Sequence, residues 1–393
     1  MRVLASPAFA AAILGAAVLV PPAEAQYSAF YAATQQELAG APGTVIRWEP
    51  LSGAPWGSKA YLVLYRSTGL QGEPIAVSGV VVVPDAEPAG GYEVIAWAHP
   101  TTGVADKCAP SLSLVLEVFK TIPGLDDMVK HGFVVTATDY PGLGTAGEHP
   151  YLVGVSEGRA VLDSVRAARQ IAGPTASNRF AVWGHSQGGH AALWTGELAA
   201  KYAPELQIVG VAAAAPASLL GDLFDDDLGT DAGKGLTALT LWSWSQIYDL
   251  DLGAIVEPED VSSVAAIGGQ CLAGFTDLVT DAAALGQINS GKFMFSDPVT
   301  TPPWSTIIVE NTPGKLAAGA PVFIAQGSRD AIVEQSVTKK FAIELCGQGV
   351  PVVFHEVTDG THTIIADVSA TAAVEWMAAR FAGEPAPTNC IKN

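Results

Sequence analysis

The 393-residue sequence has little charge, and basic residues are the scarcest kind. Charged side chains make up 15% of the chain, and 20 Lys and Arg stand against 39 Asp and Glu, which gives a formal net charge of −19. A surface this acidic repels a phosphate backbone, so nucleic acid is excluded as a partner. Hydrophobic residues make up 49% of the chain, which excludes a disordered protein and predicts a packed core.

Long hydrophobic runs are missing after the N-terminal segment. Residues 1–25 contain one Arg, an apolar stretch through Val20 and the small-x-small sequence Ala23-Glu24-Ala25, a pattern typical of a cleaved secretory signal peptide. No later segment has the roughly 18 uninterrupted apolar residues that a membrane-spanning helix needs. We therefore expect a signal peptide over 1–25, cleavage near Ala25, and a secreted or periplasmic protein without a membrane span.

Cysteine is scarce but even in number. Cys108, Cys271, Cys346 and Cys390 form no Cys-x-x-Cys pair, and no His stands near them at metal-ligand spacing. In an oxidising compartment these cysteines predict two disulfides, with all three connectivities left open. The sequence predicts neither a metal site nor a cofactor.

Between about residues 43 and 359, β-branched apolar runs alternate with helical segments. Three early runs lie close together and predict antiparallel hairpin strands, whereas the later runs, separated by helices, predict parallel strands. The expected strands cover 44–48, 60–66, 75–83, 94–98, 133–138, 180–183, 208–212, 322–325 and 352–355, and helical periodicity covers 157–170 and 191–202. This order predicts an α/β fold with a mostly parallel sheet flanked by helices.

One interval of about 100 residues, between the runs that end near Ala215 and begin at Pro321, is too long for a crossover. It contains the Asp225–Asp227 run, which we interpret as a solvated surface, and the aromatic residues Trp242 and Trp244. We predict an inserted, mainly helical cap over about 219–312. Such a cap would lie over the carboxyl ends of the strands, where ligands bind in open α/β sheets.

The pattern Gly-x-Ser-x-Gly occurs twice, at 154–158 and at 184–188. Only the second copy follows an apolar strand and precedes a helical segment, which is the arrangement of a nucleophile elbow. We therefore predict Ser186 as a nucleophile. Ser156 follows a loop and opens a helical run, so we interpret it as a helix N-cap.

Chain order selects the partners of this serine. A nucleophile elbow is followed first by an acid after a later strand and then by a histidine after the last strand. Asp330 directly follows the run 322–325, and His362 follows the run 352–355. His362 would accept the serine proton and Asp330 would orient the imidazole, with Glu334 and Asp359 as the alternative acids.

The remaining histidines near these positions receive structural interpretations. His185 and His190 flank the predicted nucleophile, and we interpret them as packing and hydrogen-bonding residues. His355 falls inside the last predicted strand and is expected in the core.

A developing oxyanion requires two backbone N–H donors. Gln187 starts the helix after Ser186, where the helix dipole also favours negative charge. The second donor is expected from the loop after the strand 94–98. Pro100 has no N–H group, so the donor is either Thr101 or Thr102.

Several segments outside the serine pattern are more specific. They are Cys-Ala-Pro-Ser at 108–111, Thr-Asp-Tyr-Pro-Gly-Leu-Gly at 138–144, Gly-His-Ser-Gln-Gly-Gly-His at 184–190 and Tyr-Ala-Pro-Glu-Leu at 202–206. Together they resemble the secretory lipase family of the lipase A type, over about residues 97–390. The resemblance implies an α/β-hydrolase domain over 26–393, with a helical cap that gates an acyl tunnel.

The resemblance also implies the roles of individual residues. It places the catalytic triad on Ser186, Asp330 and His362 and the oxyanion donors on Gln187 and Thr102. The family's two disulfides would fall on Cys108 with Cys271 and on Cys346 with Cys390. At Thr102 the best-known fungal member has an acidic residue, so the oxyanion loop departs from the family pattern there.

The sequence thus predicts a secreted serine ester hydrolase, a lipase or carboxylesterase that forms an acyl-enzyme on Ser186. The Trp and Leu content of the cap favours an apolar, fatty-acyl substrate. Acyl transfer and peptide hydrolysis remain alternatives on the same triad, because a fold does not fix the reaction. A non-catalytic binding member is a third alternative, which the intact triad disfavours. We expect a monomer that binds small-molecule or lipid esters, with transient contact with lipid interfaces.

Overall fold

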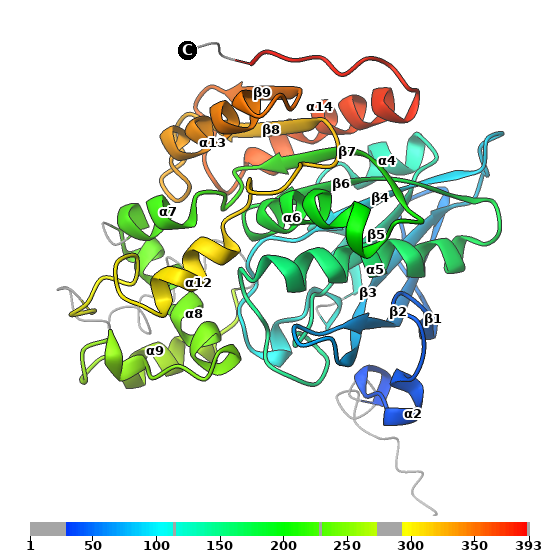
Figure 1. Ribbon diagram of the computed structural model, residues 1–393. Coiled ribbons are helices and arrows are strands. Elements are labelled where there is room, and N and C mark those ends of the chain that lie inside the picture. Colours follow the sequence, from blue (N-terminus) through cyan, green and yellow to red (C-terminus); the bar gives the residue numbers. More distant parts are fainter. Residues whose placement is uncertain (1–28, 113–114, 228–229, 273–292, 391–393) are drawn as a thin grey trace, which may run out of the picture.

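The computed structural model describes residues 29–112, 115–227, 230–272 and 293–390. The predicted signal peptide lies outside these residues. Within them the chain forms a mostly parallel sheet flanked by helices, which confirms the predicted α/β class (Figure 1).

The sheet contains nine strands in the order β1-β2-β3-β5-β4-β6-β7-β8-β9. The first three strands are antiparallel, β3 pairs with β5 antiparallel, and all later neighbours are parallel. The strands are β1 Val45–Leu51, β2 Ser58–Thr68, β3 Pro74–Pro84, β4 Tyr92–Ala98, β5 Val134–Thr138, β6 Ala176–His185, β7 Gln207–Ala214, β8 Val322–Gly327 and β9 Val352–Val357. Each overlaps one of the expected runs, so both the strand positions and the antiparallel start are confirmed.

Helices cover both faces of this sheet (Figure 1). Helices α5 and α6 pack on one face, and α4 and α14 pack on the other. The helices of this part are α2 Gln35–Leu38, α3 Val115–Lys120, α4 Leu125–Lys130, α5 Gly154–Ala172, α6 Gln187–Tyr202, α13 Gln335–Gly347 and α14 Ile365–Phe381, with short 3-10 turns at Asp106–Cys108 and Pro110–Leu112. With helices on both sides, the central strands are mostly buried, and the stretch from Phe180 to Trp183 in β6 is fully buried.

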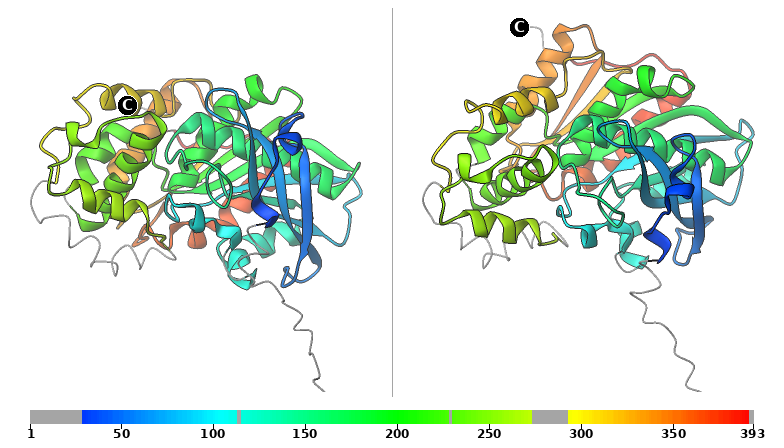
Figure 2. Two further views of the ribbon diagram at one scale, coloured as in Figure 1. Left: turned by 90° about the horizontal axis from the view of Figure 1, so that it is seen from below. Right: turned by 60° about the horizontal axis from the view of Figure 1, so that its bottom comes forward.

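The chain between β7 and β8 leaves the sheet and forms a separate helical part, here called the insertion. Its described helices are α7 Leu220–Asp227, α8 Asp231–Ile247, α9 Val261–Gly268 and α12 Trp304–Asn311, with a 3-10 turn at Leu252–Ala254. Both views in Figure 2 place the insertion beside the sheet, away from β1 to β3. Trp244 is completely buried here and donates from Nε1 to the Tyr151 carbonyl oxygen at 2.8 Å, so it anchors α8 to the main domain.

Two disulfides connect distant segments. Cys108 is bonded to Cys271, and Cys346 is bonded to Cys390, the same pairs that the family resemblance implies. The first disulfide ties the loop after β4 to the insertion. Beside it, Leu272 N–H donates to the Thr102 carbonyl oxygen at 2.8 Å, so the predicted oxyanion loop is fixed at two points.

Two interpretations of single residues are wrong. The N-cap of α5 is Val153, and Ser156 lies inside the first turn. The helix starts earlier because Asn311, from the insertion, accepts the Gly154 N–H with Oδ1 at 3.1 Å. His355 is only partly buried, because β9 is the edge strand of the sheet, although its ring stacks on Phe323 at 5.7 Å between centroids.

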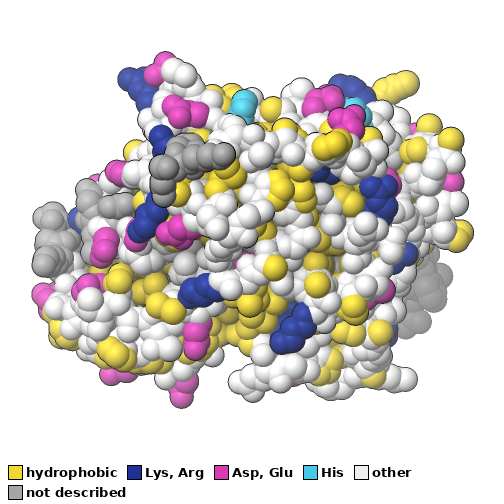
Figure 3. Space-filling model, turned by 45° about the horizontal axis from the view of Figure 1, so that its top comes forward, with side chains coloured by type: hydrophobic (Ala, Val, Ile, Leu, Met, Phe, Trp, Pro, Cys, Tyr) yellow, Lys and Arg dark blue, Asp and Glu magenta, His cyan; other side chains and the backbone are white. Residues whose placement is uncertain are grey.

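Charged side chains on the face drawn in Figure 3 are dispersed. Basic side chains stand apart from one another among acidic and uncharged ones. Across the described ranges, none of the helices has the length and apolarity to cross a membrane. In the same ranges, no group of three or more His, Cys, Asp or Glu side chains is arranged to hold a metal ion.

Candidate active site

Ser186 stands on a sharp turn between β6 and α6. Its backbone has φ 56° and ψ −117°, a conformation that a non-glycine residue rarely adopts. Neighbouring glycines make the turn sterically feasible. A Cβ atom on Gly184 would lie 2.0 Å from the Gly188 carbonyl oxygen, and one on Gly188 would lie 1.9 Å from the Ala98 carbonyl oxygen. The turn is therefore the strained strand-to-helix elbow that the sequence predicts.

Three of the predicted residues form a continuous hydrogen-bond chain. Ser186 Oγ lies 2.9 Å from His362 Nε2, and His362 Nδ1 lies 2.9 Å from Asp330 Oδ2. The three residues follow β6, β8 and β9, whose carboxyl ends lie at one edge of the sheet. All three are buried.

The alternative acids lie elsewhere. Asp359 is exposed and pairs with Arg329, with 3.5 Å between Oδ1 and Nε. Glu334 is the exposed residue that precedes α13. The contact with His362 is thus made by Asp330.

Asp330 is held in its ionised form. Burial alone would raise the pKa of its carboxyl, but the charge and hydrogen bond of His362 and the N–H groups of Ile332 and Val333 lower this pKa below its ordinary value. His185 behaves in the opposite way. Burial and the charge of neighbouring His362 lower the pKa of His185 to about 3, so this imidazole is neutral beside the hydrogen-bond chain.

The predicted oxyanion donors line two cavities that are both bordered by Ser186. Gln187 is the first residue of α6, so its N–H lies at the helix N-terminus. Thr101 Oγ1 bonds to Tyr151 Oη at 2.8 Å, whereas the buried Thr102 Oγ1 has no hydrogen-bond partner among the described residues. Thr102, unlike Thr101, therefore has an unused hydrogen-bonding hydroxyl.

A buried network behind the elbow was not anticipated from the sequence. Glu157 accepts from Gln187 Nε2 at 2.9 Å with one oxygen, and its other oxygen lies 2.6 Å from His190 Nδ1. His190 Nε2 lies 2.8 Å from the carbonyl oxygen of Asn311, at the end of α12. The network therefore links α5, the elbow helix α6 and the insertion.

One sequence signal could have indicated Glu157. It stands between Gly154 and Gly158, and a Cβ atom on either glycine would lie within 3 Å of a side chain of α6. Two small residues four apart allow two helices to approach closely. A charged residue between them is buried in the contact and requires partners.

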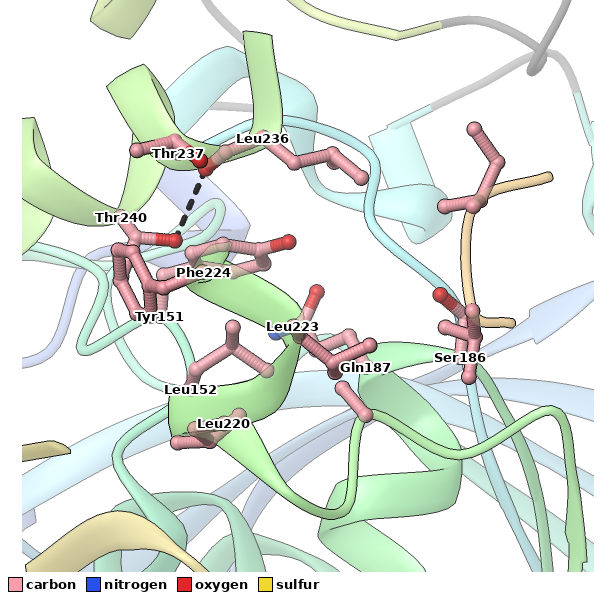
Figure 4. Close-up of a pocket in the computed structure, with 13 residues that line it drawn as sticks. Tyr151, Leu152, Ser186, Gln187, Leu220, Leu223, Phe224, Leu236, Thr237 and Thr240 are labelled. Atoms are coloured by element: carbon pink, nitrogen blue, oxygen red, sulfur yellow. Dashed lines mark hydrogen bonds between the residues drawn. The ribbon is translucent and has the colours of Figure 1, made fainter. Parts of the chain in front are cut away.

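Two cavities meet at Ser186. The smaller has a volume of about 40 Å³ and runs from Ser186 and Gln187 towards α7 and α8 (Figure 4). The larger has a volume of about 600 Å³ and is lined by the loop after β4, by His185 and by His362. Ser156, Trp242 and Trp244 line neither cavity. The insertion contributes leucines and Phe224 to the apolar wall of the smaller one, and Leu152, Ile332 and Val333 of the main domain complete it.

The sheet order, the helical insertion and the strained serine turn define an α/β-hydrolase. A comparison with protein families sharpens this class. The model of the family described as "Secretory lipase" matches residues 122–389, and the chain belongs to this family. Family membership places it among the carboxylic ester hydrolases.

Individual relatives are distant but cover most of the chain. Lipase A of Arthroderma benhamiae is 28% identical over 376 residues, which is 89% of this chain and 78% of the relative. A trichothecene C-3 esterase of Fusarium sporotrichioides is 26% identical and covers 87% of this chain and 80% of its own length. A Mycobacterium tuberculosis relative named "Probable inactive lipase MT1628" is 27% identical, covering 88% of this chain and 79% of its own.

Solved structures share the fold. Candida antarctica lipase A superposes with a TM-score of 0.76 at 22% identity, covering 92% of this chain and 87% of that one. The rice cell wall degrading esterase LipA of Xanthomonas oryzae, in a ligand-bound form, gives a TM-score of 0.70 at 22% identity, covering 85% and 96%.

Proposed function

We propose that this protein hydrolyses carboxylic esters through an acyl-enzyme on Ser186. The observation that carries the proposal is the pair of 2.9 Å contacts that join Ser186 Oγ to His362 and His362 to Asp330. His362 Nε2 accepts the hydroxyl proton as Oγ bonds to the ester carbonyl carbon. The Gln187 and Thr102 N–H groups stabilise the oxyanion that forms, with Thr102 favoured over Thr101 by its unpaired hydroxyl.

The tetrahedral intermediate then loses its alcohol. The bond between the carbonyl carbon and the alkoxy oxygen breaks, and His362 returns the proton to that oxygen. Water then enters, gives a proton to His362 and bonds to the acyl carbon. The bond from that carbon to Ser186 Oγ breaks, and His362 returns the proton to Oγ, which releases the acid and restores Ser186. The ionised Asp330 stabilises the imidazolium in both half-reactions, and its lowered pKa is consistent with this role.

The proposal includes an extracellular or periplasmic location. The sequence at residues 1–25 and the two disulfides support export, since disulfides persist in oxidising compartments. Transient contact with lipid interfaces belongs to the same proposal, because members of this family are lipases.

A non-catalytic role is the second candidate, because one relative is named as an inactive lipase. The intact hydrogen-bond chain at Ser186 favours catalysis. Acyl transfer on the same residues would appear as aminolysis or alcoholysis of the ester in place of its hydrolysis. Peptide hydrolysis would appear as cleavage of an amide.

The experiment is hydrolysis of p-nitrophenyl esters from acetate to palmitate, beside emulsified triglyceride, with Ser186→Ala in parallel. We expect turnover by the wild type and none above background by the variant. Equal rates from the two proteins, or no turnover of any ester by the wild type, would overturn the proposal. Chelator should leave the rate unchanged.

A further inference from the structure

The Gln187 side chain is fixed in one orientation. Its amide nitrogen has two hydrogens, and both are used. One goes to Glu157 Oε1 at 2.9 Å, and the other goes to His149 Nε2 at 3.1 Å. His149 can accept because its Nδ1 donates to the Pro141 carbonyl oxygen at 2.9 Å, and burial lowers the pKa of His149 to about 4, which keeps the ring neutral.

This arrangement leaves the amide oxygen of Gln187 without a donor. Gln187 is 1% exposed, and its Oε1 has no hydrogen-bond partner in the part of the chain that the structure describes. Figure 4 shows Gln187 between Ser186 and the leucines of α7, at the smaller cavity. A buried carbonyl oxygen without a donor costs free energy, so a bound group with a hydrogen-bond donor would be stabilised here.

The same cavity has a second unpartnered polar atom. Thr237 and Thr240 both line it from α8, but their hydroxyls differ. Thr240 Oγ1 donates to the Leu236 carbonyl oxygen at 2.9 Å, whereas the buried Thr237 Oγ1 has no partner among the described residues. A ligand hydroxyl that reached both atoms would complement them, since it would donate to Gln187 Oε1 and accept from Thr237 Oγ1.

The position of His362 decides which part of an ester enters each cavity. His362 must protonate the leaving alkoxy oxygen, so the alcohol lies on the side that this histidine lines. His362 lines the cavity of about 600 Å³, while the cavity of about 40 Å³ is lined by Ser186 and Gln187 without it. The smaller cavity is therefore on the acyl side.

Its size limits the acyl group. One water molecule requires about 10 to 15 Å³ of cavity volume. The smaller cavity, at about 40 Å³, therefore holds roughly three or four non-hydrogen atoms beyond the carbonyl. Resting on the function proposed above, we infer that the preferred substrates are esters of short hydroxy acids with a bulky alcohol. The acyl hydroxyl bonds to Gln187 Oε1 and Thr237 Oγ1.

The test compares ethyl butyrate, both enantiomers of ethyl 3-hydroxybutyrate, and ethyl octanoate by following acid release. The quantity of interest is the ratio of kcat/KM for the better hydroxybutyrate enantiomer to kcat/KM for butyrate. For the wild type we expect a ratio of at least about tenfold, since a site built for a hydroxyl discriminates against the analogue that lacks it. Octanoate should be poorer than butyrate.

Matched threonine variants distinguish the loss of hydroxyl recognition from a general loss of activity or folding. Thr237→Val keeps the shape but removes the unpartnered hydroxyl, and Gln187→Met removes the acceptor, so both should bring the ratio close to one. Thr240→Val removes a hydroxyl that is already paired, and Thr237→Ser retains the free one, so both should preserve the ratio.

A wild-type ratio of one or less, a preference for octanoate, or a ratio unchanged in Thr237→Val or Gln187→Met would overturn the inference. Ester hydrolysis without hydroxyl preference would leave the proposed function standing. If the wild type hydrolysed none of the esters, both this inference and the proposed function would be overturned.

Discussion

Ser156 and Ser186 each stand at the centre of a Gly-x-Ser-x-Gly segment, and both are buried, but their backbones differ. Ser156 lies in the first turn of α5, one residue among regular helical neighbours. Ser186 has a positive φ between a strand and a helix, and its hydroxyl meets His362. The five-residue pattern alone does not locate a nucleophile. The strand before Ser186 and the strained backbone at Ser186 are what distinguish the second copy of the pattern from the first.

The two segments are also connected. Glu157, from the first segment, bonds to Gln187 and His190, on the helix that follows the second. The first segment thus has a structural part in the site although its serine lines neither cavity at Ser186. Residues that do no chemistry can still fix the orientation of those that do.

The largest expected effect separates the two serines. Ser186→Ala should lower kcat by roughly 10⁴ to 10⁶, because no nucleophile remains, whereas Ser156→Ala should stay within a few-fold of the wild type. Labelling with a fluorophosphonate probe provides a direct readout. Labelling that persists in Ser186→Ala would show that the nucleophile is another residue.

The second prediction compares the last glycines of the two segments. An added Cβ on Gly188 would meet the Ala98 carbonyl oxygen at 1.9 Å, whereas on Gly158 it would lie 2.9 Å from the Leu198 side chain and 3.1 Å from the Trp194 carbonyl group. Gly188→Ala should displace the elbow and the Gln187 N–H, with a loss of at least about 100-fold in kcat. Gly158→Ala should lower the melting temperature, because the added Cβ presses α5 against α6, but its loss in kcat should be much smaller than that of Gly188→Ala. Similar activities of the two soluble variants would contradict a steric requirement at the elbow.

The hydrogen-bond chain from Ser186 through His362 to Asp330 joins residues that chain order had selected. Ser186, Asp330 and His362 each follow a strand, and strands can be recognised from local apolar runs. The misjudged positions depend on neighbours that are remote in sequence. The start of α5 depends on Asn311, from α12, and the exposure of His355 depends on β9 being an edge strand. The orientation of Gln187 and the polar lining at Thr237 depend on how the insertion packs. The local sequence around these residues does not predict that packing.

A third prediction concerns the support that the first segment gives to the second. Glu157→Gln retains the size of the side chain but weakens its bonds to Gln187 Nε2 and His190 Nδ1. We expect kcat to fall about tenfold with little change in KM, because a small displacement of an oxyanion donor affects the transition state more than ground-state binding. Glu205→Gln, a surface carboxylate paired with Arg166, is the matched control. An unchanged kcat in Glu157→Gln would show that Glu157 does not position Gln187 for catalysis.

The smallest expected effect extends the comparison to two buried aspartates that follow strands. Asp330 has His362 as a partner and a lowered pKa, but Asp139 has only neutral donors. Burial raises the pKa of Asp139 to about 6. Because this value exceeds that of the unfolded chain, the folded state binds the proton more tightly, and the contribution of Asp139 to stability falls as pH rises through 6.

Lowering the pH from 7 to 5 should therefore stabilise the wild type by about 1 kcal/mol relative to Asp139→Asn. Urea unfolding of both proteins at the two pH values measures this difference. Because the other titrating groups are the same in both proteins, their contributions cancel. A difference of zero would mean that Asp139 titrates at its ordinary pKa, so that its neutral donors fully offset the cost of burying its carboxylate.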